Sequence, residues 1–99
     1  MEQDYLNDPE FQELIRQYVQ YLSDNLPEVK RNLTEKDYLK IQKFGHNLKG
    51  SGGGYGLNEI SAIGQKIEET AKLQDYEKIK ELIDEFDQLL QTAVDKWLN

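Results

Sequence analysis

Apolar side chains recur every three or four residues in four segments of the chain, the spacing that gathers side chains on one face of an α-helix. The first stripe consists of Phe11, Leu14, Ile15, Tyr18, Val19, Leu22, Leu26, Val29 and Leu33. The second consists of Tyr38, Ile41, Phe44 and Leu48, and the third of Leu57, Ile60, Ile63 and Ile67. The fourth and longest consists of Tyr76, Ile79, Leu82, Ile83, Phe86, Leu89, Leu90, Ala93, Val94 and Trp97. No segment alternates with period two, so the pattern predicts helices and no strands.

Polar and turn-forming residues around the stripes predict where the helices begin. Asp8 can cap the first helix, with Pro9 in its first turn, where no backbone donor is needed. Residues 34–37 (Thr-Glu-Lys-Asp) resemble a capping box with aspartate in place of glutamate. Asn58 can cap the third helix and Asp75 the fourth.

Two further positions affect how the helices end and how they are arranged. Pro27 falls inside the first stripe, where it removes a backbone donor, so we expect a kink there or a break into two pieces. Gly56 is well placed to end the second helix in the left-handed conformation. Because the connections are short, neighbouring helices should run antiparallel. The predicted fold is all-α: an up-down antiparallel four-helix bundle over about residues 8–97, within a single domain of 99 residues.

Composition and charge exclude several classes of function. The chain has no cysteine and one histidine, which excludes disulfides, thiolate metal sites and sites that need two histidine ligands. Twelve basic and nineteen acidic residues give a net charge of −7, so we expect no binding to nucleic acid or to an anionic membrane. The acidic residues 1–4 do not resemble a signal peptide, and no stretch approaches the roughly 20 apolar residues of a membrane span. We therefore expect a cytoplasmic protein.

Five of the seven glycines lie in residues 50–56, at the end of the second helix. This run is not a Walker phosphate loop, because Leu57 follows the last glycine in place of Lys-Ser or Lys-Thr. It also fails the spacing of a dinucleotide-binding loop, and no strand precedes it. Each glycine weakens a helix by about 1 kcal/mol, so we expect an offsetting benefit. Close contact between helices is one benefit, and free space beside His46 for another protein is the other.

The only histidine lies on the outer face of the second helix. At 100° per residue, His46 points about 150° away from the core direction set by Ile41, Phe44 and Leu48. Lys43 and Lys49 precede and follow it by three residues, which makes them neighbours on the helix surface. Their ammonium groups could stabilise an anionic phosphoryl group on the ring. A surface histidine of this kind without any function is the alternative that the helical wheel leaves open.

The segment His46-Asn47-Leu48-Lys49-Gly50-Ser51, followed by Gly56, resembles the signature of histidine-phosphotransfer (HPt) domains. The pair Ile67-Glu68 and the layout of four helices are also similar to that family. The resemblance implies that His46 is the phosphoacceptor, through Nε2, and that Lys49 lies beside the phosphoryl group. It implies that Gly50 lets a receiver domain approach closely. It also implies that Glu68 accepts a hydrogen bond from Nδ1–H of His46 and so fixes the tautomer.

The resemblance further implies the partners and the division of chemistry. A response-regulator receiver domain, a hybrid sensor histidine kinase or both would be the partners of a monomeric relay intermediate. The receiver would bring the aspartate and Mg²⁺, so we expect no cofactor on this chain and no self-sufficient enzyme. We expect receiver docking at the outward-facing residues Leu39, Gln42, Lys43 and Gly53. Phe11 and Ile15 are weaker docking candidates, for which plain core packing is the preferred interpretation.

Three alternatives remain open from the sequence. The chain could be a degenerate HPt-like module that binds receiver or kinase domains without carrying phosphate. It could be a structural bundle that pairs with other helices, although this needs a second exposed apolar stripe, and only isolated outward residues such as Tyr21 and Leu39 are present. It could also be a domain excised from a larger kinase, with unchanged chemistry.

Overall fold

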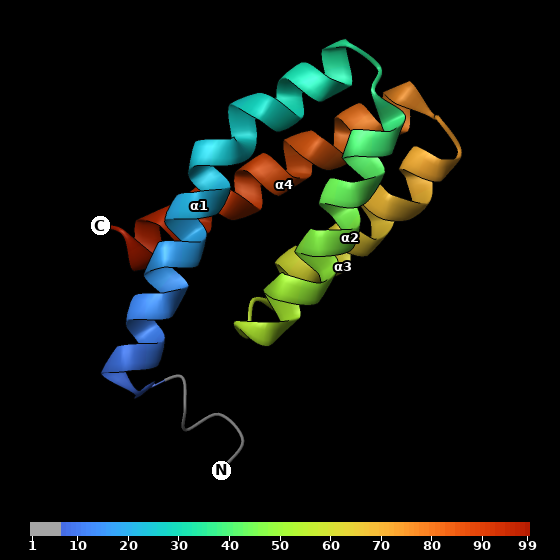
Figure 1. Ribbon diagram of the computed structural model, residues 1–99. Coiled ribbons are helices and arrows are strands. Elements are labelled where there is room, and N and C mark those ends of the chain that lie inside the picture. The colour runs from blue at the N-terminus through green and yellow to red at the C-terminus, as the bar shows by residue number, and fades with distance from the viewer. Residues whose placement is uncertain (1–6) are drawn as a thin grey trace.

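The computed structural model describes residues 7–99, which form four helices. They are α1 (Pro9–Thr34), α2 (Tyr38–Gly54), α3 (Asn58–Lys72) and α4 (Tyr76–Trp97). Consecutive helices run up and down the molecule in an antiparallel bundle (Figure 1), and no strand occurs in these residues, which confirms the predicted fold class. The prediction about the acidic residues 1–4 lies outside the described part of the chain.

Aspartate side chains cap three of the four helices. Asp8 accepts a hydrogen bond from the backbone N–H of Glu10 at 2.9 Å, and Asp75 accepts one from Lys78 at 3.2 Å, which confirms both predicted caps. At the start of α2 the cap is Asp37, which accepts from the N–H of Lys40 at 3.2 Å.

The predicted capping box at residues 34–37 and the predicted cap Asn58 are both wrong. Thr34 is still helical: it is the last residue of α1, and its hydroxyl donates to the Lys30 carbonyl at 3.2 Å. Asn58 is the first residue of α3, and the cap position before it is Leu57, which makes no side-chain cap hydrogen bond. At α3 the reason is the tight turn before the helix, in which the N–H of Leu57 donates back to the Gly52 carbonyl at 2.9 Å.

Helix α1 is not broken at Pro27. The helix is continuous from Pro9 to Thr34, although Figure 1 shows it changing direction between its two halves. Proline removes one hydrogen bond from the helix. Leu26 and Val29 on either side of it are buried in the core, and this packing holds both halves in one helix.

The core lies along the bundle axis and receives side chains from all four helices. Phe86 of α4 is completely buried, and Phe44 of α2 packs against it edge-on with ring centroids 5.4 Å apart. The buried apolar residues are Ile15, Tyr18, Val19, Leu22, Leu26, Val29, Leu33, Ile41, Leu48, Ile60, Ile63, Ile67, Ala71, Ile79, Leu82, Ile83, Phe86, Leu90 and Ala93. Ile15 is completely buried, so it is not a docking residue, as its place in the apolar stripe already favoured.

Helices α2 and α3 approach each other so closely that their backbones touch. A Cβ atom added to Gly45 would lie 2.6 Å from the backbone nitrogen of Glu68 and 2.7 Å from the carbonyl oxygen of Gly64. A Cβ on Gly64 would lie 2.6 Å from the backbone nitrogen of Lys49. Real Cβ atoms do not approach other atoms this closely, so only glycine fits at these two positions. The hydroxyl of Ser61 adds a hydrogen bond across the same contact, to the Lys49 carbonyl at 2.6 Å.

The glycine-rich end of α2 is held in place by contacts with α1. The phenol oxygen of Tyr18 lies 2.6 Å from the hydroxyl of Ser51, and the Tyr18 ring stacks on Tyr55 with centroids 4.5 Å apart. Burial raises the pKa of Tyr18, while its hydrogen bond to Ser51 acts in the opposite direction. Gly56 follows with a φ of 75°, which confirms its predicted role in ending the helix.

Replacing Gly45 with alanine should destabilise the bundle by about 1–3 kcal/mol, because the added methyl group has only rigid backbone to displace. Urea unfolding of the variant and the wild type measures this difference. Gly54→Ala is the matched control, since a Cβ there meets nothing within 4 Å, and it should not reduce stability. A Gly45→Ala variant as stable as the wild type would contradict the close approach of α2 and α3.

Candidate functional site

His46 stands on the outer face of α2, near the middle of the helix. Its side chain is 69% exposed, as the helical wheel predicts. The backbone beneath it is fixed by the contact between Gly45 and α3. The imidazole therefore projects into solvent from a rigid base and is not part of the core.

Glu68 of α3 orients the imidazole ring. Its Oε2 lies 3.0 Å from Nδ1 of His46, and its side chain is only 14% exposed. A carboxylate can only accept, so in the neutral ring the hydrogen-bonding proton is on Nδ1 and the lone pair is on Nε2. Nε2 makes no hydrogen bond to any of residues 7–99. The arrangement presents an accessible nucleophilic nitrogen to solvent, with the tautomer set by the other nitrogen.

The contact between His46 and Glu68 depends directly on the glycines between α2 and α3. Gly45 precedes the histidine, and the backbone nitrogen of Glu68 lies where a side chain at Gly45 would have to be. Any larger residue at that position would separate the two helices. The separation would lengthen the hydrogen bond, so the same contact fixes both the fold and the geometry of the site.

Lysine side chains from two helices, α2 and α3, lie around the pair formed by His46 and Glu68. Lys43 and Lys49 are exposed one turn before and one turn after His46 on α2, and neither forms an ion pair with any described residue. Lys72 of α3 lies on the far side of Glu68, with its Nζ 4.0 Å from Oε2. The lysines on α2 are thus available to an anion attached to Nε2. Three or more His, Cys, Asp or Glu side chains do not gather into a metal site anywhere within residues 7–99.

The family model of the Hpt domain matches residues 13–96. The chain belongs to the Hpt domain family. A search of curated proteins and a search of solved structures found no match. Membership indicates phosphotransfer-type function in two-component signalling, with receiver or kinase domains as the general class of partner. None of the helices formed by residues 7–99 is both long and apolar enough to cross a membrane.

The glycines of the Hpt chain fall into two groups with different physical reasons. Gly52 is buried and would place a Cβ 2.9 Å from the backbone of Ser61, so the fold requires it. A Cβ on Gly50 would meet nothing within 4 Å, and one on Gly53 would make only ordinary contact with the Ser61 side chain at 3.5 Å. The fold does not require glycine at these two exposed positions. They lie four and seven residues after His46, on the same side of α2.

The other predicted docking residues differ in how exposed they are. Leu39 is 60% exposed and Lys43 is exposed, whereas Gln42 is half-buried. Phe11 is also half-buried and packs on Tyr55 with ring centroids 6.1 Å apart, so it belongs to the end of the core.

Two features of the site were not found from the sequence. One is Gly64, which receives the backbone of α2; a glycine within the apolar stripe of the third segment was the available signal. The other is Lys72, whose contact with Glu68 depends on the spacing of four residues along α3.

In the wild type the neutral His46 ring should carry its proton mainly on Nδ1, because Glu68 accepts it there. In Glu68→Ala the fraction of this tautomer should fall, while Glu69→Ala, an exposed neighbour on α3, should leave it unchanged. Long-range ¹H–¹⁵N correlation spectra at mildly alkaline pH distinguish the two tautomers. Equal tautomer populations in the wild type and Glu68→Ala would show that the carboxylate does not orient the ring.

Proposed function

We propose that this protein is a phosphorelay intermediate. It accepts a phosphoryl group on Nε2 of His46 from the aspartate of one receiver domain and passes it to the aspartate of another. The observation that supports the proposal is the exposed imidazole whose Nδ1 is bound to Glu68 at 3.0 Å and whose Nε2 has no partner among residues 7–99. The motif around His46, within the matched Hpt region, supports it as well.

The proposed transfer is a single in-line displacement at phosphorus. The Nε2 lone pair forms the P–N bond as the P–O bond to the aspartate breaks, and the carboxylate leaves with that electron pair. The ring gains positive charge during the step, and the Glu68 carboxylate beside Nδ1 offsets it. Lys49 and Lys43 stabilise the negative phosphoryl oxygens. The reverse reaction uses the same contacts, so the relative free energies of the partners set the direction.

The proposed division of labour leaves the metal with the partner. We place Mg²⁺ and the aspartate on the receiver, and only the oriented imidazole and its lysines on this chain. In this scheme the protein is a carrier without a cofactor and is not an enzyme by itself. It acts as a monomer, with the surface around His46 open to the receiver.

The proposed docking surface follows the outer face of α2. Leu39 provides an exposed apolar contact, Lys43 a charge, and Gly50 and Gly53 a low surface on which the receiver approaches the helix backbone. Because the fold does not require glycine at these positions, their cost of about 1 kcal/mol each in a helix is explained by this intermolecular approach.

The test of phosphate transfer uses phosphoramidate as a small phosphodonor, followed by receiver domains from the same organism. We expect ³¹P spectra to show a phosphohistidine that is acid-labile, that is absent in His46→Gln and that disappears when a receiver is added. Label that persists in His46→Gln would defeat the assignment. A wild type that binds a receiver but acquires no phosphohistidine from phosphoramidate would favour the degenerate module described above.

Replacing Gly50 with alanine should separate stability from docking. We expect the variant to gain up to about 1 kcal/mol in free energy of unfolding, because the methyl group is free of contacts and alanine favours the helix. Transfer from a receiver should slow by about tenfold or more, while labelling by phosphoramidate stays unchanged. Gly54→Ala is the matched control, exposed and free of contacts but eight residues from His46, and it should leave transfer unchanged. Wild-type transfer rates in Gly50→Ala would remove Gly50 from the docking surface.

A further inference from the structure

One carboxylate oxygen of Glu68 has a nitrogen neighbour on each of two helices. Oε2 lies 3.0 Å from Nδ1 of His46 on α2 and 4.0 Å from Nζ of Lys72, which follows Glu68 by one turn on α3. Among the described residues, no other side chain forms a hydrogen bond or an ion pair with this carboxylate. The group that orients the imidazole is therefore an acceptor whose negative charge is partly offset by a lysine.

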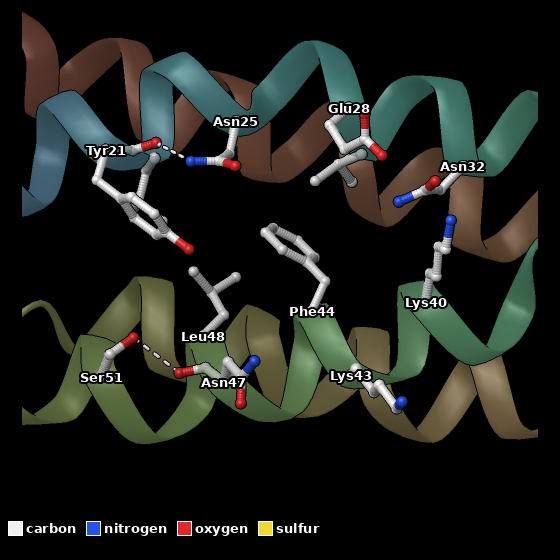
Figure 2. A pocket seen from close by; sticks show the side chains of 12 residues that line it. Tyr21, Asn25, Glu28, Asn32, Lys40, Lys43, Phe44, Asn47, Leu48 and Ser51 are labelled. Carbon is white, nitrogen blue, oxygen red and sulfur yellow. Dashed lines mark hydrogen bonds between the residues drawn. The ribbon is translucent and has the colours of Figure 1, made fainter.

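The lysine on the opposite flank of α2 cannot offset the charge of Glu68. Figure 2 shows Lys40 extending from α2 toward Asn32 on α1, across a groove that lies between these two helices. Its Nζ lies 3.7 Å from the carboxylate of Asp37 at the start of α2. Within residues 7–99, Lys72 is the one lysine that forms an ion pair with Glu68.

The sheltered position of the Glu68 carboxylate makes it sensitive to a nearby cation. Its side chain is 14% exposed, and water and salt screen a charge less when it is partly removed from solvent. The Lys72 side chain is 55% exposed, which weakens the interaction. We therefore expect Lys72 to change the behaviour of the site by a factor of a few and not by orders of magnitude.

We propose that Lys72 is a positioning residue that acts through Glu68 and lengthens the lifetime of the phosphoryl group on His46. The lysine weakens Glu68 as an acceptor, so the carboxylate holds the proton on Nδ1 of the phosphorylated ring less strongly. This inference rests on the proposed relay and concerns the regulation of the same site. Lys72 needs no contact with the phosphoryl group, which is attached to the other ring nitrogen.

The reason is the charge that the ring carries when the phosphoryl group leaves. In hydrolysis, a water oxygen forms a bond to phosphorus as the P–N bond breaks, and the electron pair of that bond returns to Nε2. A ring with a proton on Nδ1 leaves as neutral imidazole, whereas a ring without it would leave as an anion. The water releases a proton to solvent, and the products are inorganic phosphate and the neutral ring. An acceptor that stabilises the Nδ1 proton thus speeds this loss, and a cation beside the acceptor slows it.

The test measures the lifetime of the phosphohistidine in the full chain. The wild type and each variant are labelled with phosphoramidate, the donor is removed, and ³¹P spectra follow the loss of the signal at neutral pH. We expect Lys72→Gln to shorten the lifetime about two- to fivefold, the range of an exposed ion pair. Lys72→Arg should restore it, and Lys66→Gln, an exposed lysine on the same helix, should leave it unchanged. An unchanged or longer lifetime in Lys72→Gln would overturn the proposal.

A double-mutant cycle separates action through Glu68 from other effects of Lys72. A lysine in the last turn of α3 also favours the helix dipole, and this contribution does not depend on Glu68. In a Glu68→Gln background the carboxylate charge is absent, so Lys72→Gln should no longer change the phosphohistidine lifetime. The same shortening in both backgrounds would show that Lys72 acts on the phosphoryl group directly or through the helix, and would overturn the proposal.

A measurement without phosphate distinguishes failure of this inference from failure of the relay. In the unphosphorylated protein, Lys72→Gln should move the ¹⁵N resonance of His46 Nδ1 downfield, because Glu68 becomes a stronger acceptor. An unchanged resonance would overturn the role of Lys72, whatever the protein does with phosphoramidate. A wild type that acquires no phosphohistidine would instead overturn the relay, and the resonance would still decide whether Lys72 acts on His46 through Glu68.

Discussion

The rest of the structure depends on the contact of two backbones, where α2 and α3 meet at Gly45 and Gly64. No side chain fits between the helices at this point, so their separation is set by the peptide groups themselves. Peptide groups are far stiffer than the tips of side chains. The position of Glu68 relative to His46 is therefore fixed by backbone geometry, and a hydrogen bond of 3.0 Å between two helices is kept without the help of any surrounding loop.

The glycines illustrate how stability and function impose different requirements on one residue type. Gly45, Gly52 and Gly64 are buried and strengthen the bundle by allowing close packing. Gly50 and Gly53 are exposed and weaken the same helix, and no contact among the described residues explains them. Burial of nineteen apolar residues in the described part of the chain, together with the cap Asp37, offsets that cost. The bundle is thus stable enough to carry a helix that is locally suboptimal where another protein approaches.

Helix α2 carries different chemistry on its different flanks. The flank toward α3 holds His46 beside Glu68, and the flank toward α1 borders the groove that contains Asn32. The unequal packing of α2 is the reason. Close contact with α3 fixes the histidine, and sparse contact with α1 leaves space that side chains only partly fill. A single helix thereby combines a rigid site and an adaptable surface.

The sequence by itself determined the four helices, the exposed position of His46, and the caps Asp8 and Asp75, because these follow from local periodicity and from hydrogen bonds within a few residues. It misplaced the cap of α2 because α1 continues through Thr34, and the cap of α3 because the turn at Gly56 shifts the start of that helix. It identified the pairing of Glu68 with His46 only through family resemblance, since 22 residues separate them. The role of Gly64 and the groove at Asn32 required the tertiary structure, because the distance between two helices is set by all the side chains packed between them, and no local pattern records that distance.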